Sequence, residues 1–129
     1  MGITVGLKGT ATAIVNDTDT AKSVGSGSLD VFATPMMVAL MEKASCAAID
    51  NNLDEGSTTV GTMVNVEHLS ATPIGMKVTV ESTVTAVDGR KIGFETIAYD
   101  EAGVIGKGTH DRFVVNAEKF TANTYFKKQ

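Results

Sequence analysis

Tryptophan is absent from this chain of 129 residues, and aromatic residues make up only 5% of it. Proteins that bind single-stranded nucleic acid stack bases on aromatic side chains, and duplex binders carry a basic face. The chain has neither feature, because its 15 acidic residues outnumber its 11 basic residues and give a formal net charge of −4. We therefore expect no nucleic-acid partner and no electrostatic attraction to an anionic membrane.

Cysteine is nearly absent as well, since Cys46 is the only one in the sequence. A single cysteine excludes an intrachain disulfide and a cysteine-built metal site, and it suits a reducing cytosol. No zinc-site spacing and no phosphate-binding glycine loop is present, so we expect neither a metal nor a cofactor. A cysteine nucleophile is a weak alternative, because a free cysteine inside a helix is usually a small core residue.

Long hydrophobic runs are also scarce. The amino-terminal residues lack the apolar core of a signal peptide. The one long apolar run, residues 35–49, is interrupted by Glu42 and Lys43 and is too short to span a membrane. We expect a cytoplasmic protein with no membrane partner.

The same run predicts a long helix. Its residues are strong helix formers, Thr34 is a candidate N-cap, and Pro35 suits the first helical position. A helix that is apolar nearly all round is a buried one. Lys43 can extend its stem to water, but the shorter Glu42 then needs a partner or a raised pKa. Glu42 is thus a candidate general base or nucleophile, and the alternative is a glutamate on a narrow solvated strip.

Five segments have the composition of strands, separated by turn signals such as Asp88-Gly89. They cover residues 10–15, 58–70, 76–87, 91–100 and 104–115. Residues 16–30 are rich in Gly, Ser, Thr and Asp and predict a mobile loop or lid. The last residues, 120–129, are expected to fray.

One strand, one long helix and then four antiparallel strands is the order of a hotdog fold. In this α+β fold a five-stranded antiparallel sheet wraps around one central helix. We expect one domain over residues 1–129. Because five strands cover only part of the helix, its remaining apolar surface predicts a homodimer. Whether dimers pair into tetramers is left open.

Strand alternation places His68 on the same face as Val60 and Val66, the face expected to meet the helix and Glu42. A core histidine bonded to a backbone carbonyl is the alternative to an acid–base role. Gly61 falls on the opposite face of the same strand, where a glycine indicates a bulge or close backbone approach.

The start of the helix is a second candidate site. The Thr34 hydroxyl is expected to cap the first turn, whose free amides suit a developing oxyanion. Glu42 lies eight residues further on, about 12 Å along a helix axis. Either the chain folds back at Thr34 or the substrate spans two protomers. His110 and Arg112 are expected at an exposed strand end with a surface Asp–Arg pair.

Several of these motifs together resemble one known family. The matching segments are residues 31–38, 40–42, 60–62, 71–75, 87–90 and 108–110, together with His68. They run in the same order over about residues 5–120 and resemble the thioesterase family that includes fluoroacetyl-CoA thioesterase. The resemblance implies a catalytic set of Thr34, Glu42 and His68. It further implies that Gly61 and Arg112 contact the substrate.

The resemblance predicts an acyl-CoA thioesterase that acts on small or medium acyl groups. Alternatives are a non-catalytic acyl-CoA-binding module and a hydratase or dehydratase of the same fold. The fluoroacetate-specific member of the family carries a phenylalanine lid. The matching loop here, residues 23–29, holds no aromatic residue, which predicts a more open pocket.

Overall fold

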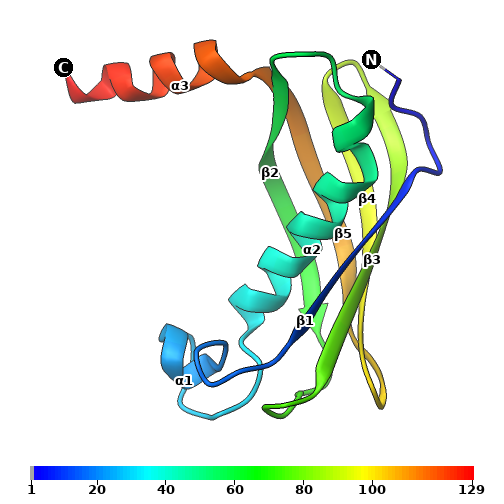
Figure 1. Ribbon diagram of the computed structural model, residues 1–129, viewed down its shortest axis with the longest axis vertical. Helices are drawn as coiled ribbons and strands as arrows, with labels where there is room; N and C mark the ends of the chain where they lie inside the picture. Colours follow the sequence, from blue (N-terminus) through cyan, green and yellow to red (C-terminus); the bar gives the residue numbers. More distant parts are fainter. Residues whose placement is uncertain (1) are drawn as a thin grey trace.

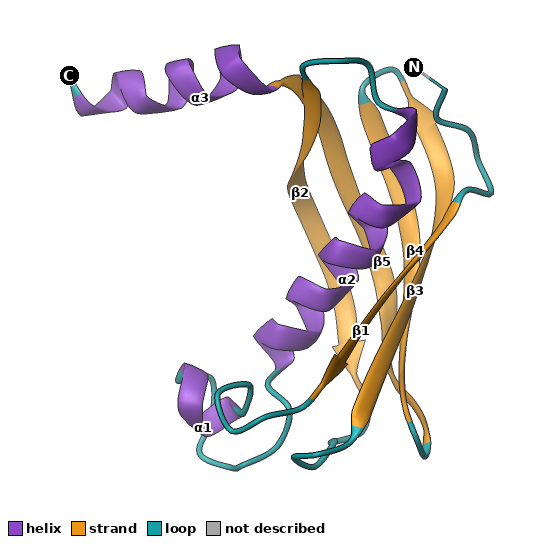
Figure 2. Ribbon diagram, in the orientation of Figure 1, coloured by secondary structure: helices purple, strands orange, loops and turns teal. Residues whose placement is uncertain are grey.

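A curved antiparallel sheet wraps around one long helix in the computed structural model, which describes residues 2–129 (Figures 1 and 2). The strand order is β1-β3-β4-β5-β2, so that β1 and β2 form the two edges. The elements are β1 (Lys8–Ile14), α2 (Thr34–Ile49), η1 (Asp50–Asn52), β2 (Ser57–His68), β3 (Lys77–Asp88), β4 (Lys91–Asp100) and β5 (Gly103–Asn116). The architecture predicted from the sequence is confirmed, with strand ends displaced by a few residues at most.

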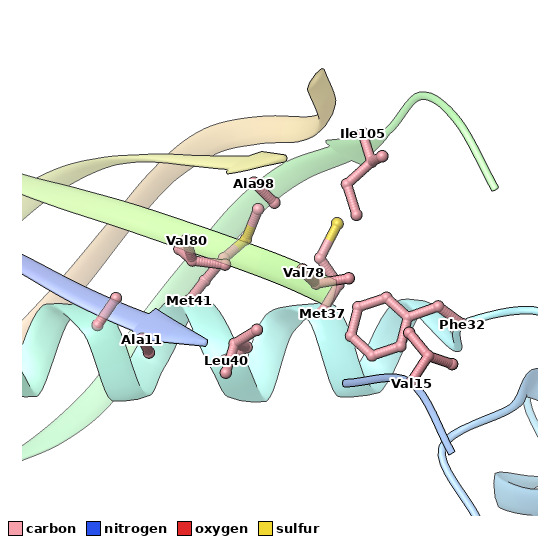
Figure 3. Close-up of a cluster of buried hydrophobic side chains, with 11 residues drawn as sticks. Ala11, Val15, Phe32, Met37, Leu40, Met41, Val78, Val80, Ala98 and Ile105 are labelled. Atoms are coloured by element: carbon pink, nitrogen blue, oxygen red, sulfur yellow. The ribbon is translucent and has the colours of Figure 1, made fainter. Parts of the chain in front are cut away.

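Side chains of α2 fill the space between the helix and the sheet (Figure 3). Met37 and Met41 are 0% and 1% exposed, and they pack against Val78 and Val80 of β3. Burying a side chain of this size contributes about 1.5–3 kcal/mol. The edge strand β1 approaches α2 so closely that a Cβ atom on Gly9 would overlap the backbone of the helix. These contacts fix the distance between α2 and the sheet.

A chain of buried hydroxyl groups also ties α2 to the sheet. Ser45 donates to the Met41 carbonyl at 2.9 Å, and its Oγ lies 3.0 Å from the Oγ of Ser82. Ser82 is in turn 3.0 Å from the Oγ1 of Thr96 on β4. Polar groups in a core stabilise one arrangement only when they are paired. The network therefore fixes the rotation of α2 at the turn that carries Glu42.

One side of α2 is left partly open, so the prediction of a helix buried all round is wrong. Thr34, Val38, Glu42 and Cys46 follow one another at intervals of four residues and form a line that faces β2. None of them is fully buried, and the Glu42 side chain is 40% exposed. The neighbouring line at positions 35, 39, 43 and 47 is exposed, whereas Met37 and Met41 are buried against β3 and β4.

The segment predicted as a loop or lid and the predicted fraying end both contain short helices. Within residues 16–30, Thr20 caps a single turn, α1 (Ala21–Val24), by accepting a hydrogen bond from the Ser23 amide at 3.2 Å. At the carboxyl end, Asn116 caps α3 (Ala117–Tyr125), which continues into η2 (Phe126–Lys128). α3 has no buried residue and projects beyond β2 (Figure 1). No helix of the described chain is long and apolar enough to cross a membrane.

Candidate active site

A β-bulge in β2 determines which residues face α2. The register of β2 against β5 shifts between Gly61 and Met63, which leaves Thr62 as the extra residue. Before the bulge, Thr59 and Gly61 face the helix; after it, Val66 and His68 do. An extra residue inverts the alternation of side chains. The prediction that Gly61 lies on the opposite face from His68 is therefore wrong.

Thr34 and His68 form a direct pair at the start of α2. The Thr34 Oγ1 lies 2.8 Å from the His68 Nδ1. Thr34 is the first residue of the helix, and the N-cap position is taken by Ala33, whose side chain cannot form a cap. The predicted role of Thr34 as an N-cap is therefore wrong, because its hydroxyl turns to β2. Phe32 meets the His68 ring edge-on at 6.5 Å and helps to hold its orientation.

The other ring nitrogen of His68 has no partner. Nε2 is buried and makes no hydrogen bond within the described residues. Burial lowers the pKa of His68 from its usual value of 6.5, and a weaker backbone interaction with Ser70 opposes the shift. The ring adjoins a pocket of about 250 Å³ lined by Thr34, Ser26 of the predicted lid and Ser70. Burial thus favours a neutral imidazole, one ring nitrogen of which lacks a hydrogen-bond partner in the described chain.

Glu42 forms an ion pair with Arg112 of β5 under the middle of α2. The Arg112 Nη1 donates to the Glu42 Oε2 at 3.0 Å, and the arginine side chain is 8% exposed. Arg112 also donates from Nε to the Thr59 hydroxyl at 2.8 Å and from Nη2 to the Thr59 carbonyl at 3.1 Å. The predicted surface Asp–Arg pair is wrong, because Arg112 points inward and Asp111 lies 3.6 Å from Lys91 instead.

Gly61 makes room for this ion pair. A Cβ atom at position 61 would lie 2.5 Å from the Glu42 Oε2 and 3.2 Å from the Arg112 Nη1. Both atoms belong to side chains, so a larger residue would displace the ion pair and leave the backbone in place. The close approach that a strand glycine indicates is therefore an approach to Glu42.

His110 belongs to the same cluster and is buried. The sequence-based prediction that it lies at an exposed strand end is wrong. His110 is 1% exposed and stacks on Phe94 with ring centroids 5.9 Å apart. Its Nε2 lies 3.2 Å from the Arg112 Nη1. A signal was present in the sequence, because His110 and Arg112 share strand parity with the apolar Val114.

The structure brings the candidate residues together in two groups. Thr34 and His68 form one, and Glu42, Gly61 and Arg112 form the other. No hydrogen bond joins the two groups within residues 2–129. Thr34 and Glu42 lie on the same face of a regular helix, two turns and about 12 Å apart along its axis. The chain does not fold back at Thr34.

Cys46 lies one turn beyond Glu42 on the same line. Burial raises the pKa of the Cys46 thiol above its usual value of 9.0, although Arg112 opposes the shift. A thiol that stays protonated is a poor nucleophile. No group of three or more His, Cys, Asp or Glu residues that could hold a metal ion occurs in the described chain.

The curved five-stranded antiparallel sheet around one long helix places the molecule among hotdog-fold proteins, a fold that it shares with solved thioesterases. Residues 15–118 match the family model described as fluoroacetyl-CoA-specific thioesterase. Since this match covers most of the chain, the protein belongs to that family, and its activity is thioester hydrolysis.

Individual relatives agree with this assignment. The chain is 43% identical over 93 residues to a fluoroacetyl-CoA thioesterase of Streptantibioticus cattleyicolor. This alignment covers 72% of this chain and 67% of the relative. A threonine-to-serine variant of a fluoroacetyl-CoA thioesterase in complex with acetyl-CoA superposes with a TM-score of 0.93 at 34% identity, over 98% of this chain and 100% of that one. A Thermus thermophilus thioesterase superfamily member gives 0.90 at 28% identity, over 98% and 93%.

The lowered pKa of His68 predicts the acid side of the pH profile. Burial favours the neutral ring, so protonation and loss of activity require a pH below the usual histidine value of 6.5. We expect kcat/KM, measured between about pH 5 and 8, to stay level at neutral pH and to fall only below that value. The control is His68→Asn, which keeps a side-chain partner for Thr34 but does not titrate. An inflection at or above pH 6.5, or an unchanged inflection in His68→Asn, would contradict the assignment.

Proposed function

We propose that this protein hydrolyses acyl-CoA thioesters with small or medium acyl groups, and that Glu42 and the Thr34–His68 pair act on one bound thioester. The observation that carries the proposal is their placement. Glu42 and Thr34 lie on one line of α2 that faces β2, and His68 faces back from β2. Because the two groups lie about 12 Å apart along α2 and the chain does not fold back at Thr34, a thioester that contacts both of them spans two protomers in this proposal.

Glu42 activates a water molecule in this proposal. Its Oε2 is held by Arg112, whereas its Oε1 makes no hydrogen bond among residues 2–129 and is free to accept a proton. A carboxylate oxygen that is free to accept a proton suits a general base, which acts on a water molecule within hydrogen-bond distance. We therefore assign Glu42 as general base rather than as a nucleophile that forms an anhydride.

Thr34 and His68 stabilise the oxyanion. If the Thr34 hydroxyl donates to the His68 Nδ1, the buried Nε2 carries a hydrogen that can be donated to the substrate. If Nδ1 donates instead, the Thr34 hydroxyl hydrogen is free. Either tautomer leaves one donor for the developing charge. The amides of Met36 and Met37 already donate to the Ala33 carbonyl, so the helix start itself contributes little beyond the Thr34 amide.

A second protomer completes the site in this proposal. β2 is an edge strand, and Met63, Val64 and Leu69 on or beside it are 38%, 42% and 53% exposed. Pairing two β2 edges would cover these side chains and close the open side of the α2 line. α3 projects beyond β2 (Figure 1) and would lie beside the partner in such a dimer. The protein is thus proposed to be a homodimer, acting in the cytoplasm.

Gly61 and Arg112 act on the acyl end of the substrate chiefly by positioning Glu42. Gly61 leaves room beside the carboxylate. Arg112 has four of its five N–H groups engaged within the protein and retains one on Nη2. A relative solved with acetyl-CoA supports coenzyme A as the carrier.

Replacing Glu42 by glutamine tests the proposed base. Glutamine keeps an oxygen that accepts from Arg112, so the fold is retained while the basic oxygen is lost. We expect Glu42→Gln to lower kcat for acetyl-CoA by a factor of about 100 or more, measured as release of free thiol. Activity within a few-fold of the unmodified protein would remove Glu42 from the mechanism.

Light scattering on both proteins provides the control. The unmodified protein and Glu42→Gln should both have the mass of two chains of 13.5 kDa each. The substitution lies beside the proposed interface, but it changes none of the exposed apolar side chains that the interface would cover. A single-chain mass for the unmodified, active protein would refute the dimer without affecting the role of Glu42.

The composition of the lid predicts a low preference for fluorine. Residues 25–28 are Gly-Ser-Gly-Ser, and the apolar side chains that flank them, Val24 and Leu29, are 41% and 66% exposed. Such a loop buries little apolar surface over an acyl group. We expect kcat/KM for fluoroacetyl-CoA and acetyl-CoA to differ by less than about 100-fold, or about 2.7 kcal/mol. A larger preference for fluoroacetyl-CoA would contradict this interpretation of the lid.

A further inference from the structure

We propose that His110 is a positioning residue for the hydrolytic reaction. It accepts a hydrogen bond from Arg112 and thereby fixes the guanidinium group that holds Glu42. The inference rests on the proposed role of Glu42 as the base. No hydrogen bond joins His110 to α2 among residues 2–129, and its effect on catalysis passes through Arg112.

The partners of His110 determine its tautomer. Its Nδ1 lies 2.7 Å from the Met63 carbonyl, which can only accept, so Nδ1 carries the hydrogen. Its Nε2 is then a bare acceptor, and it lies 3.2 Å from the Arg112 Nη1, which can only donate. Met63 directly follows the β-bulge of β2. The bulge therefore sets the tautomer of His110 as well as the direction of Gly61.

Packing prevents the ring from turning. His110 is 1% exposed and lies nearly parallel to Phe94, with an interplanar angle of 27°. Its neighbour on the β2 side is Gly61, where a Cβ atom would lie 3.3 Å from the His110 Cε1. The charged groups that face the cluster are Arg112 and, through it, Glu42. The acceptor of His110 is therefore available to Arg112 alone.

The two hydrogens of the Arg112 Nη1 are divided between His110 and Glu42. One goes to the His110 Nε2 and the other to the Glu42 Oε2. Without the histidine acceptor, a buried N–H would lose its partner and the guanidinium would be free to shift. The Glu42 Oε2 would shift with it, and the free Oε1 would no longer point at the attacking water. Misplacement of a catalytic group lowers kcat more than it changes substrate binding.

Two amide substitutions separate the two hydrogen bonds of His110. His110→Asn places an amide nitrogen near the Nδ1 position and keeps the bond to Met63, but it offers Arg112 no acceptor. His110→Gln places an amide oxygen near the Nε2 position and keeps the bond to Arg112. Asparagine is one methylene shorter than glutamine and leaves the larger gap beside Phe94, so the stability of the two variants is compared as well. His110→Phe, which keeps the stacking on Phe94, replaces His110→Asn if the latter does not fold.

Steady-state hydrolysis of acetyl-CoA is measured for these variants and for Glu42→Gln, with folding checked by urea unfolding. We expect His110→Asn to lower kcat about tenfold or more with KM within about threefold, and His110→Gln to stay within about threefold of the unmodified protein. A kcat for His110→Asn within threefold, or equal loss in both amide variants, would overturn the proposal. An active Glu42→Gln would instead overturn the proposed function on which it rests.

Discussion

The ion pair between Arg112 and Glu42 is the interaction on which the arrangement of the site depends. A guanidinium that is 8% exposed carries a charge out of water, and this is costly unless the charge is paired and its N–H groups are bonded. Thr59, His110 and Glu42 together provide those partners. Glu42 retains contact with solvent on one side, so the pair is both anchored in the protein and open to a substrate. A carboxylate on a largely apolar helix is tolerated because β5 supplies its partner.

One face of α2 packs against the sheet and stabilises the fold, and another face carries the candidate catalytic residues. Its sheet side carries the methionines and the buried Ser45, which fix its distance and rotation against β3 and β4. Its β2 side carries Thr34 and Glu42 and is only partly covered by the protomer. An edge strand beside this open side is a surface that a second chain can cover. The free edge of the sheet at β2 thus leaves the site open and also favours association with a second chain.

Much of the fold follows from the sequence, because its signals are local. Asp88-Gly89 predicts a hairpin that the structure has, with Gly89 at a φ of 60°. The long helix follows equally from its composition and from Pro35.

The surroundings of the site do not follow, because one extra residue in β2 inverts the strand alternation, and the sequence contains no separate signal for the bulge. Thr34 was expected to cap the helix for a similar reason: a hydroxyl at a helix start has a local use, and the competing partner His68 is 34 residues away. His110 and Arg112 share the parity of a buried valine, but two polar side chains next to Asp111 resemble a surface strand until their partners on β2 are known.

The central claim is that Arg112 acts on catalysis through Glu42, and a double-mutant cycle on kcat/KM tests it most directly. The cycle compares Arg112→Met, Glu42→Gln and the double variant with the unmodified protein, each confirmed as folded. If Arg112 works by holding Glu42, the double variant should hydrolyse acetyl-CoA no more slowly than Glu42→Gln alone, so that the two losses are not additive. Independent effects, in which the double variant shows the product of the two single losses, would contradict the account.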